Sequence, residues 1–214
     1  DDDTAPDGLL PLASSDYRIV EGYSAFYSAL AESLDIRLNT PVYQIDWQNQ
    51  VRVSTAAGLF EADAVIITLP VGVLQSGDVS FNPVLPAGKQ TALNGLKMGP
   101  VMKMVYRFEQ PITDTAIGAI YSKDTPPMWW SPSLNRETEA VIWTAFFSGD
   151  YAREMLALGE NRALQKGLQT LREAVNQPDL MYRHAEWVNW PHDPFARGGY
   201  SVVLPGHETA REEL

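Results

Sequence analysis

Residues 101–108 read VMKMVYRF, and their side chains alternate in character along the chain. Successive side chains of a β-strand point to opposite faces, so this alternation predicts a strand. One face carries Met102, Met104, Tyr106 and Phe108, and the other carries Val101, Lys103, Val105 and Arg107. We therefore expect a strand over 101–108 with Lys103 on one face and the methionines and aromatic residues on the other.

Two longer runs are also expected to be strands. Residues 140–147 are rich in β-branched and aromatic residues, which favour strands. The apolar run 64–69, AVIITL, is continuously apolar and ends at Pro70. That pattern is typical of a strand buried on both faces of an α/β sheet. Shorter extended segments are predicted at 35–39, 42–46, 51–55, 59–62 and 181–190.

Four segments are expected to be helices. Residues 22–34 and 161–175 carry apolar side chains at the spacing of an amphipathic helix. Shorter helices are predicted at 88–96 and 150–158. The strands and helices do not alternate strictly as βαβ units. The fold class we expect is therefore α+β (mixed α/β), with a mixed β-sheet flanked by helices.

The composition is that of an ordinary globular protein. Of the 214 residues, 45% are hydrophobic and 20% are charged, which excludes wholesale disorder. The formal net charge of -11 repels phosphate backbones, so nucleic acid is not an expected partner. No apolar run approaches the roughly 18 residues that span a bilayer, so no membrane partner is expected. Residues 1–16 are acidic and contain proline and glycine, which predicts a flexible lead.

Most motifs that carry chemistry are missing from this sequence. There is no cysteine, which excludes disulfides, thiolate metal sites and cysteine nucleophiles. His184, His192 and His207 show no metal-ligand spacing, so no metal site is expected. The serine-nucleophile pattern G-x-S-x-G, the phosphate loop and the dinucleotide-binding pattern G-x-G-x-x-G are absent as well.

Three features leave a choice of interpretation. Lys103 is either a solvent-facing lysine on a half-exposed strand or a lysine in a partly dry site, where its ammonium can order water. The aromatic series along 187–200 either packs into the core or lines a site for a flat ligand or a cation. Met128-Trp129-Trp130 is expected to pack internally. The residues alone therefore predict a soluble mixed α/β domain and leave the role of its aromatic side chains open.

Several stretches, in this order, resemble the flavin-containing amine oxidases, and most closely the polyamine oxidases and the flavin-dependent histone lysine demethylases. One continuous part of the match is ADAVIITLPVGVL at 62–74. Another stretch, from Trp190 to Pro205, is similar to the family's W…DP…RGSYS…PG pattern. The resemblance covers roughly residues 17–206. Its other parts are VEGYS at 20–24, residues 29–42, FNPVLP at 81–86 and GPVMK at 99–103.

The resemblance implies a two-domain FAD enzyme whose domains interleave along the chain. Residues 17–80 would belong to the FAD-binding domain, residues 81–196 to the substrate-binding domain, and residues 197–214 again to the FAD-binding domain. The family's dinucleotide fingerprint and its C-terminal FAD segment are not in this sequence. The resemblance therefore implies an internal fragment, the substrate-domain half of the enzyme with part of the FAD domain.

The reaction that the resemblance implies is oxidation of a small-molecule amine, with a polyamine as one candidate. A hydride equivalent passes from the carbon beside the nitrogen to FAD, the imine hydrolyses, and oxygen is reduced to hydrogen peroxide. Gly199 stands where the monoamine oxidases carry the cysteine that links the flavin, so FAD would be bound non-covalently.

The resemblance also assigns roles to individual residues. Lys103 matches the lysine that holds a water near the reactive flavin nitrogen, where a fixed cation stabilises charge as oxygen is reduced. Tyr200 matches an aromatic residue of the box that guides the substrate nitrogen. These two residues are the catalytic candidates. The cofactor-binding candidates are Val42, Thr68, Leu69, Pro70, Trp190 and Phe195.

Two alternatives stay open. A related FAD desaturase or protoporphyrinogen-type oxidase would share the fold, although those enzymes usually lack a lysine at the position of Lys103. A non-catalytic binding module with an amine-oxidase-like fold would explain the missing nucleotide fingerprint. For the isolated chain we expect no activity, no tight FAD binding, and self-association through apolar surface that missing segments leave bare. A cytoplasmic location is expected.

Overall fold

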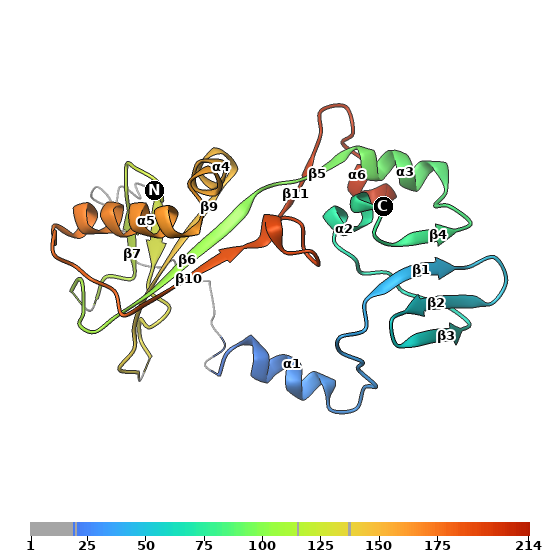
Figure 1. Ribbon diagram of the computed structural model, residues 1–214, viewed down its shortest axis with the longest axis horizontal. Coiled ribbons are helices and arrows are strands. Elements are labelled where there is room, and N and C mark those ends of the chain that lie inside the picture. Colours follow the sequence, from blue (N-terminus) through green and yellow to red (C-terminus); the bar gives the residue numbers. More distant parts are fainter. Residues whose placement is uncertain (1–18, 20, 115, 137) are drawn as a thin grey trace, which may run out of the picture. The chain divides into compact units, whose positions relative to one another are not determined.

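The computed structural model describes residues 19, 21–114, 116–136 and 138–214 (Figure 1). The acidic segment 1–16, expected to be a flexible lead, lies outside the described residues. The chain forms two compact units. Unit 1 consists of Pro100–Asn189 together with the described residues up to Ser24, and unit 2 consists of Ala25–Gly99 together with Trp190–Leu214.

The two units divide the chain at Ser24/Ala25, Gly99/Pro100 and Asn189/Trp190, whereas the expected boundaries between the FAD and substrate domains fall at 80/81 and 196/197. The units reflect compactness alone, and compactness does not reveal which segments bind FAD. The assignment of residues 17–80, 81–196 and 197–214 to FAD and substrate domains therefore stays a prediction.

Unit 1 is built on one five-stranded sheet. Its strands are β6 (Val101–Phe108), β7 (Ala119–Tyr121), β8 (Met128–Trp130), β9 (Val141–Ser148) and β10 (His184–Asn189). They lie in the order β10-β6-β9-β8-β7, and every neighbouring pair is antiparallel. The alternating stretch 101–108 and the aromatic-rich run 140–147 are thus confirmed as strands, and they are neighbours in the sheet.

Helices α4 (Gly149–Leu158) and α5 (Glu160–Val175) pack on one face of this sheet. The predicted helices 150–158 and 161–175 are confirmed, and α5 ends where Asn176 adopts a left-handed conformation with φ of 53°. The core lies between the helices and the sheet. It contains Met102, Met104, Tyr106, Phe108, Trp129, Trp143, Ala145 and Phe147 from the strands, and Met155, Leu164, Leu168 and Leu171 from the helices.

Helix α5 approaches the sheet closely at Gly167. The hydroxyl of Tyr106 donates a hydrogen bond to the carbonyl oxygen of Leu164, 2.8 Å away. A Cβ at position 167 would lie 2.5 Å from the same hydroxyl oxygen, so the contact requires glycine. Burial, and after it the neighbouring Tyr182, raises the pKa of Tyr106, which keeps the hydroxyl protonated as a donor.

Unit 2 contains a mixed four-stranded sheet. Its strands are β1 (Val42–Asp46), β2 (Val51–Thr55), β3 (Gly58–Ala62) and β4 (Ser80–Asn82), in the order β3-β2-β1-β4. Strand β1 is parallel to β4 and antiparallel to β2. The extended segments predicted at 42–46, 51–55 and 59–62 are confirmed as strands, and neighbours along the chain pair with each other. Its core is small and consists of Ile45, Val51, Val73 and Val79.

The rest of unit 2 is a two-stranded ribbon and short helices. Strand β5 (Leu96–Met98) pairs with β11 (Ser201–Val203), which joins the two chain segments of the unit. The helix expected at 88–96 is α3 (Ala87–Asn94). That expected at 22–34 is α1 (Tyr23–Ala31), which begins in the last two residues of the first segment of unit 1 and has no buried residue. The remaining elements are α2 (Val71–Ser76), the 3-10 helix η1 (Trp190–His192) and α6 (Ala210–Glu213). The mixed α/β fold class is confirmed.

Two strand predictions were wrong. Residues 35–39 form no strand and lie in the connection between α1 and β1, with a turn at 38–39. Asp35 and Arg37 pair with each other there, and Asn39 has a φ of 53°. The apolar run 64–69 belongs to no strand of the described chain, and Ile66 is 90% exposed. A buried strand needs hydrogen-bonding neighbours and a cover on both faces, and the described part of unit 2 provides neither for this run.

Candidate functional site

The candidate site in unit 1 is the face of the sheet that α4 and α5 do not cover. On β6, Lys103 is paired with Phe146 of β9 and Val188 of β10. In the next row Thr144 of β9 is paired with Trp130 of β8. Residues directly opposite each other in antiparallel strands share a face. We call the surface formed by Lys103, Val105, Met128, Trp130, Thr144, Phe146 and Val188 the Lys103 face.

Lys103 lies among aromatic side chains on this face. Its Nζ is 5.5 Å from the centroid of the Trp130 ring, which is the geometry of a cation–π contact. The rings of Trp130 and Phe146 are 6.2 Å apart and inclined by 52°. Lys103 itself is half-buried. The structure therefore favours the interpretation of a lysine held in a partly dry site over that of a freely solvated lysine.

The sequence Met128-Trp129-Trp130 divides between the two faces of β8. Trp129 is fully buried in the core beside Tyr106, as the packing interpretation expects. Trp130 is half-buried and faces Lys103. Sequence reasoning missed Trp130 because a three-residue strand gives too short an alternation to be recognised. The signal available was the pair of adjacent tryptophans, since neighbouring residues of a strand must point to opposite faces.

In unit 2 the predicted site residues Trp190, Phe195 and Tyr200 lie on the segment 190–200, which we call the aromatic loop. The carbonyl oxygen of Trp190 accepts hydrogen bonds from the amides of Asp193 and Gly198, at 3.2 and 3.0 Å. The Asp193 carboxylate accepts one from the amide of Phe195 at 2.7 Å. The rings of Phe195 and Tyr200 are 69% and 62% exposed. These hydrogen bonds hold the backbone of 190–198 in place, and Phe195 and Tyr200 are both exposed to solvent.

The other predicted cofactor residues lie at the edge of the small core of unit 2. Val42 and Leu69 pack against that core, Pro70 precedes the first turn of α2, and Thr68 is exposed. Helix α2 packs tightly on the aromatic loop, because a Cβ at Gly72 would lie 2.7 Å from the Cβ of Arg197.

The predicted site residues therefore fall into two groups. An ion pair between Arg197 and Asp78 holds the aromatic loop within unit 2. The structure brings residues 68–70 and the aromatic loop together in unit 2, whereas Lys103 lies in unit 1.

The residues of unit 2 fit the flat ring system of a flavin. The set offers exposed aromatic rings at Phe195 and Tyr200 and an exposed apolar segment whose backbone belongs to no described strand. Such rings stack on a planar aromatic ligand, and backbone groups outside a sheet can bond its polar edge. The sequence offers no G-x-G-x-x-G turn for the pyrophosphate.

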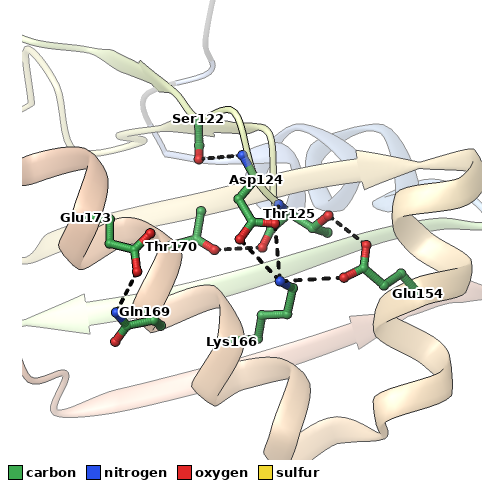
Figure 2. A network of polar contacts seen from close by, with 8 residues as sticks. All are labelled: Ser122, Asp124, Thr125, Glu154, Lys166, Gln169, Thr170 and Glu173. Carbon is green, nitrogen blue, oxygen red and sulfur yellow. Dashed lines mark hydrogen bonds and ion pairs between the residues drawn. The ribbon is translucent and has the colours of Figure 1, made fainter.

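A second cluster of charged groups lies on the helix side of unit 1, and Figure 2 shows its arrangement. Lys166 of α5 lies 3.2 Å from the Asp124 carboxylate and 3.5 Å from that of Glu154 on α4. The Thr125 hydroxyl donates to Glu154, and the buried Thr170 hydroxyl donates to the carbonyl of Thr125, both at 2.8 Å. We call these five residues the polar clamp.

The charges of the polar clamp compensate one another. The pKa of Asp124 is lowered, first by the amide of Thr125 and then by Lys166. Desolvation is the largest single effect on Lys166 and lowers its pKa, but Asp124 and Glu154 together outweigh it, so the pKa is raised. Asp124 and Lys166 are each held in the charged form by their neighbours, which suits a fastening between the 122–127 loop and the helices rather than acid–base chemistry.

One hollow in unit 1 is distinct from the Lys103 face. Its volume is about 600 Å³, and Pro111, Ile112, Asp114, Tyr121 and Gln177 are among the residues that line it. None of the predicted site residues lines this hollow, and its walls bring together no pair of groups suited to acid–base work. We therefore treat the Lys103 face of unit 1 and the aromatic loop of unit 2 as two candidate surfaces, each described within its own unit. None of the helices described here has the length and apolarity to cross a membrane.

Comparison with known proteins connects these surfaces to one family. The model of the flavin-containing amine oxidoreductases matches residues 8–213. Lysine-specific histone demethylase 2 of Homo sapiens is 29% identical over 199 residues, which cover 88% of this chain and 24% of that protein. Probable polyamine oxidase 4 of Arabidopsis thaliana is 41% identical over 195 residues, covering 88% of this chain and 38% of that protein.

The fold agrees with solved structures. Wild-type putrescine oxidase bound to putrescine superposes with a TM-score of 0.76 at 20% sequence identity, over 91% of this chain and 44% of that one. The chain spans about a quarter to two fifths of the length of the curated relatives named above. From the match along nearly all of its length, the chain belongs to the flavin-containing amine oxidase family.

Proposed function

We propose that these 214 residues are part of an FAD-dependent enzyme that oxidises an amine to an imine and uses oxygen as the final acceptor, giving hydrogen peroxide. The observation that carries the proposal is the position of Lys103. In a chain of this family, it lies half-buried among aromatic rings, on the sheet face that the helices leave bare. A lysine that served only for solubility would not need such a setting.

The proposed substrate is a polyamine. Two observations support it: relatives of this chain carry the names polyamine oxidase and putrescine oxidase, and the net charge of this chain is -11. A negative field raises the local concentration of a polycation and steers it toward the protein. Relatives named as histone demethylases make a methylated lysine side chain the second amine to test.

Each predicted residue has a defined task in this proposal. FAD, when bound, supplies the hydride acceptor. The ammonium of Lys103 orders a water molecule and stabilises negative charge that develops as oxygen is reduced. The ring of Tyr200 guides the amine nitrogen of the substrate, and Trp190 and Phe195 flank the planar cofactor. Val42, Thr68, Leu69 and Pro70 contribute backbone and apolar contacts to it.

The test uses the longest polypeptide that contains these residues. Its visible spectrum is recorded before and after spermine is added without oxygen. Flavin bands that bleach, and peroxide that appears when air is admitted, are the expected results. A yellow protein that is bleached by none of spermine, spermidine, putrescine or a methyl-lysine peptide would contradict amine oxidation and favour a desaturase-type oxidase. A folded but colourless protein that takes up no added FAD would favour a non-catalytic binding module.

A further inference from the structure

The position of Trp130 carries an inference beyond the proposed function, on which it rests. We propose that Trp130 is a positioning residue that holds the Lys103 ammonium at a fixed place on the Lys103 face. Trp130 comes from β8 and Lys103 from β6, two strands that do not touch, since β9 runs between them. Their side chains nevertheless approach to 5.5 Å between Nζ and the ring centroid.

Strand geometry explains why this approach needs a particular neighbour. Adjacent strands are about 4.8 Å apart, so β6 and β8 are separated by about 10 Å and both side chains must lean across β9. Thr144 of β9 stands in the same row as Trp130 and is only 5% exposed. A small side chain at this position leaves room for the indole and the lysine chain to meet above it.

A second aromatic ring also lies close to the indole. Phe146 is the cross-strand partner of Lys103, and its ring lies 6.2 Å from that of Trp130. Trp130 thus lies near the ring of Phe146 and is paired across the strands with the buried Thr144. The side chain of a lysine, by contrast, has four rotatable bonds. A rigid aromatic surface beneath a flexible cation reduces the range of positions that the cation can occupy.

A second charged group could hold the lysine in place of Trp130. Glu186 of β10 is the cross-strand partner of Val105 and shares the Lys103 face, but its carboxylate lies 3.3 Å from the ring of His184. Glu186 is also exposed, so water screens its attraction for a lysine. Glu186→Gln therefore serves as a matched control, because it removes a nearby charge and leaves the aromatic contact intact.

The contact can be measured without any activity. The lysines of the full-length polypeptide are converted to dimethyl-lysine with ¹³C-labelled formaldehyde, which keeps their charge, and Lys103→Arg identifies the signal of Lys103. An indole ring below the ammonium shifts that signal upfield of the exposed lysines. We expect the shift to be lost in Trp130→Leu and retained in Trp130→Phe and Glu186→Gln. A Lys103 signal at the position of an exposed lysine in the wild-type protein would overturn the proposal.

The kinetic consequence is tested by a double-mutant cycle on the flavin-loaded protein. Trp130→Leu should slow reoxidation of the flavin by oxygen about 10-fold, in keeping with the loss of one partly desolvated cation–π contact. Anaerobic bleaching by the amine should be less affected. In a Lys103→Met background the same substitution should have no further effect, because Trp130 acts through the lysine.

Three outcomes separate this proposal from the proposed function and from simple damage to the fold. Trp130→Leu that slows reoxidation equally in both backgrounds would show that the tryptophan acts independently of Lys103 and would overturn the proposal. Lys103→Met that reoxidises at the wild-type rate would refute the role of the lysine, while the ¹³C shift still decides where Trp130 holds it. Trp129→Phe, a change on the core side of the same strand, should leave both the ¹³C shift of Lys103 and the rate of flavin reoxidation unchanged.

Discussion

Two apolar runs of the chain look alike in sequence and have opposite fates. The run at 141–148, VIWTAFFS, is strand β9, which lies between β6 and β8 and buries Ala145 and Phe147 under α4 and α5. The apolar run 64–69, AVIITL, forms no described strand, and Ile66 is 90% exposed. Composition is the same kind of signal in both. The difference lies in whether the partners for a strand are found among the described residues.

A hydrophobic run indicates that burial is favourable, but it does not identify the segment that covers it. Burial is favourable because each buried aliphatic side chain contributes about 1.5–3 kcal/mol. The chain spans only 24% and 38% of two of its curated relatives. We expect the cover of the apolar run 64–69 to come from segments that these longer proteins contain.

The largest expected effect tests the buried member of the pair. Phe147→Ala should destabilise unit 1 by about 3–5 kcal/mol, because Phe147 is 1% exposed and its removal leaves a cavity in the core. Ile66→Ala, in the exposed run, should change the free energy of unfolding by less than about 0.5 kcal/mol. Chemical denaturation of the 214-residue chain measures both. Equal losses would contradict the exposed position of the apolar run 64–69.

The next largest effect tests how closely helix α5 packs on strand β6 at Gly167. Gly167→Ala should cost about 1–3 kcal/mol, because the new methyl group would lie 2.5 Å from the Tyr106 hydroxyl. The matched control is Gly88→Ala in α3, where nothing lies within 4 Å of the added Cβ. That change should be neutral or stabilise by up to about 1 kcal/mol. Thermal unfolding of the two variants distinguishes these outcomes, and a neutral Gly167→Ala would refute the close helix–sheet contact.

These contrasts show how far sequence reasoning reached. The strands β6 and β9 and the helix α5 could be predicted because their packing partners lie within the chain. The side chains that their hydrophobic periodicity predicts to be buried are therefore the ones that lie in the core. The run 64–69 could not, since its partners are not among the described residues. At the site, Lys103 was visible as a charge inside an apolar strand. Trp130 was not, because only the sheet order places β8 two strands away from β6.

A smaller effect concerns the exposed run itself. Bare apolar surface promotes association, so we expect the isolated 214-residue chain to self-associate. Ile66→Asp should weaken this association about tenfold, as placing a charge at the contact removes one buried aliphatic side chain and repels its copy. Sedimentation velocity over a range of concentrations gives the measurement. The control Val84→Asp also replaces an exposed aliphatic residue, but outside the apolar run 64–69. A monomeric wild-type chain would contradict the expectation.

The smallest effect tests the polar clamp that fastens the helices over β9. The pKa of Asp124 is lowered in the folded protein, first by the Thr125 amide and then by Lys166. The carboxylate therefore stabilises the fold above its unfolded pKa of about 3.9, and this contribution is lost as the pH falls through the lower folded value. Its side chain is 58% exposed, so solvent screening keeps the contribution below about 1 kcal/mol.

Asp124→Asn should lower stability at neutral pH and make little difference in strong acid. Asp179→Asn, at an exposed position outside the clamp, should follow the wild-type protein at both pH values. If Asp124→Asn and Asp179→Asn gave the same pH profile of unfolding, the stabilising role of the Asp124 carboxylate in the polar clamp would be refuted.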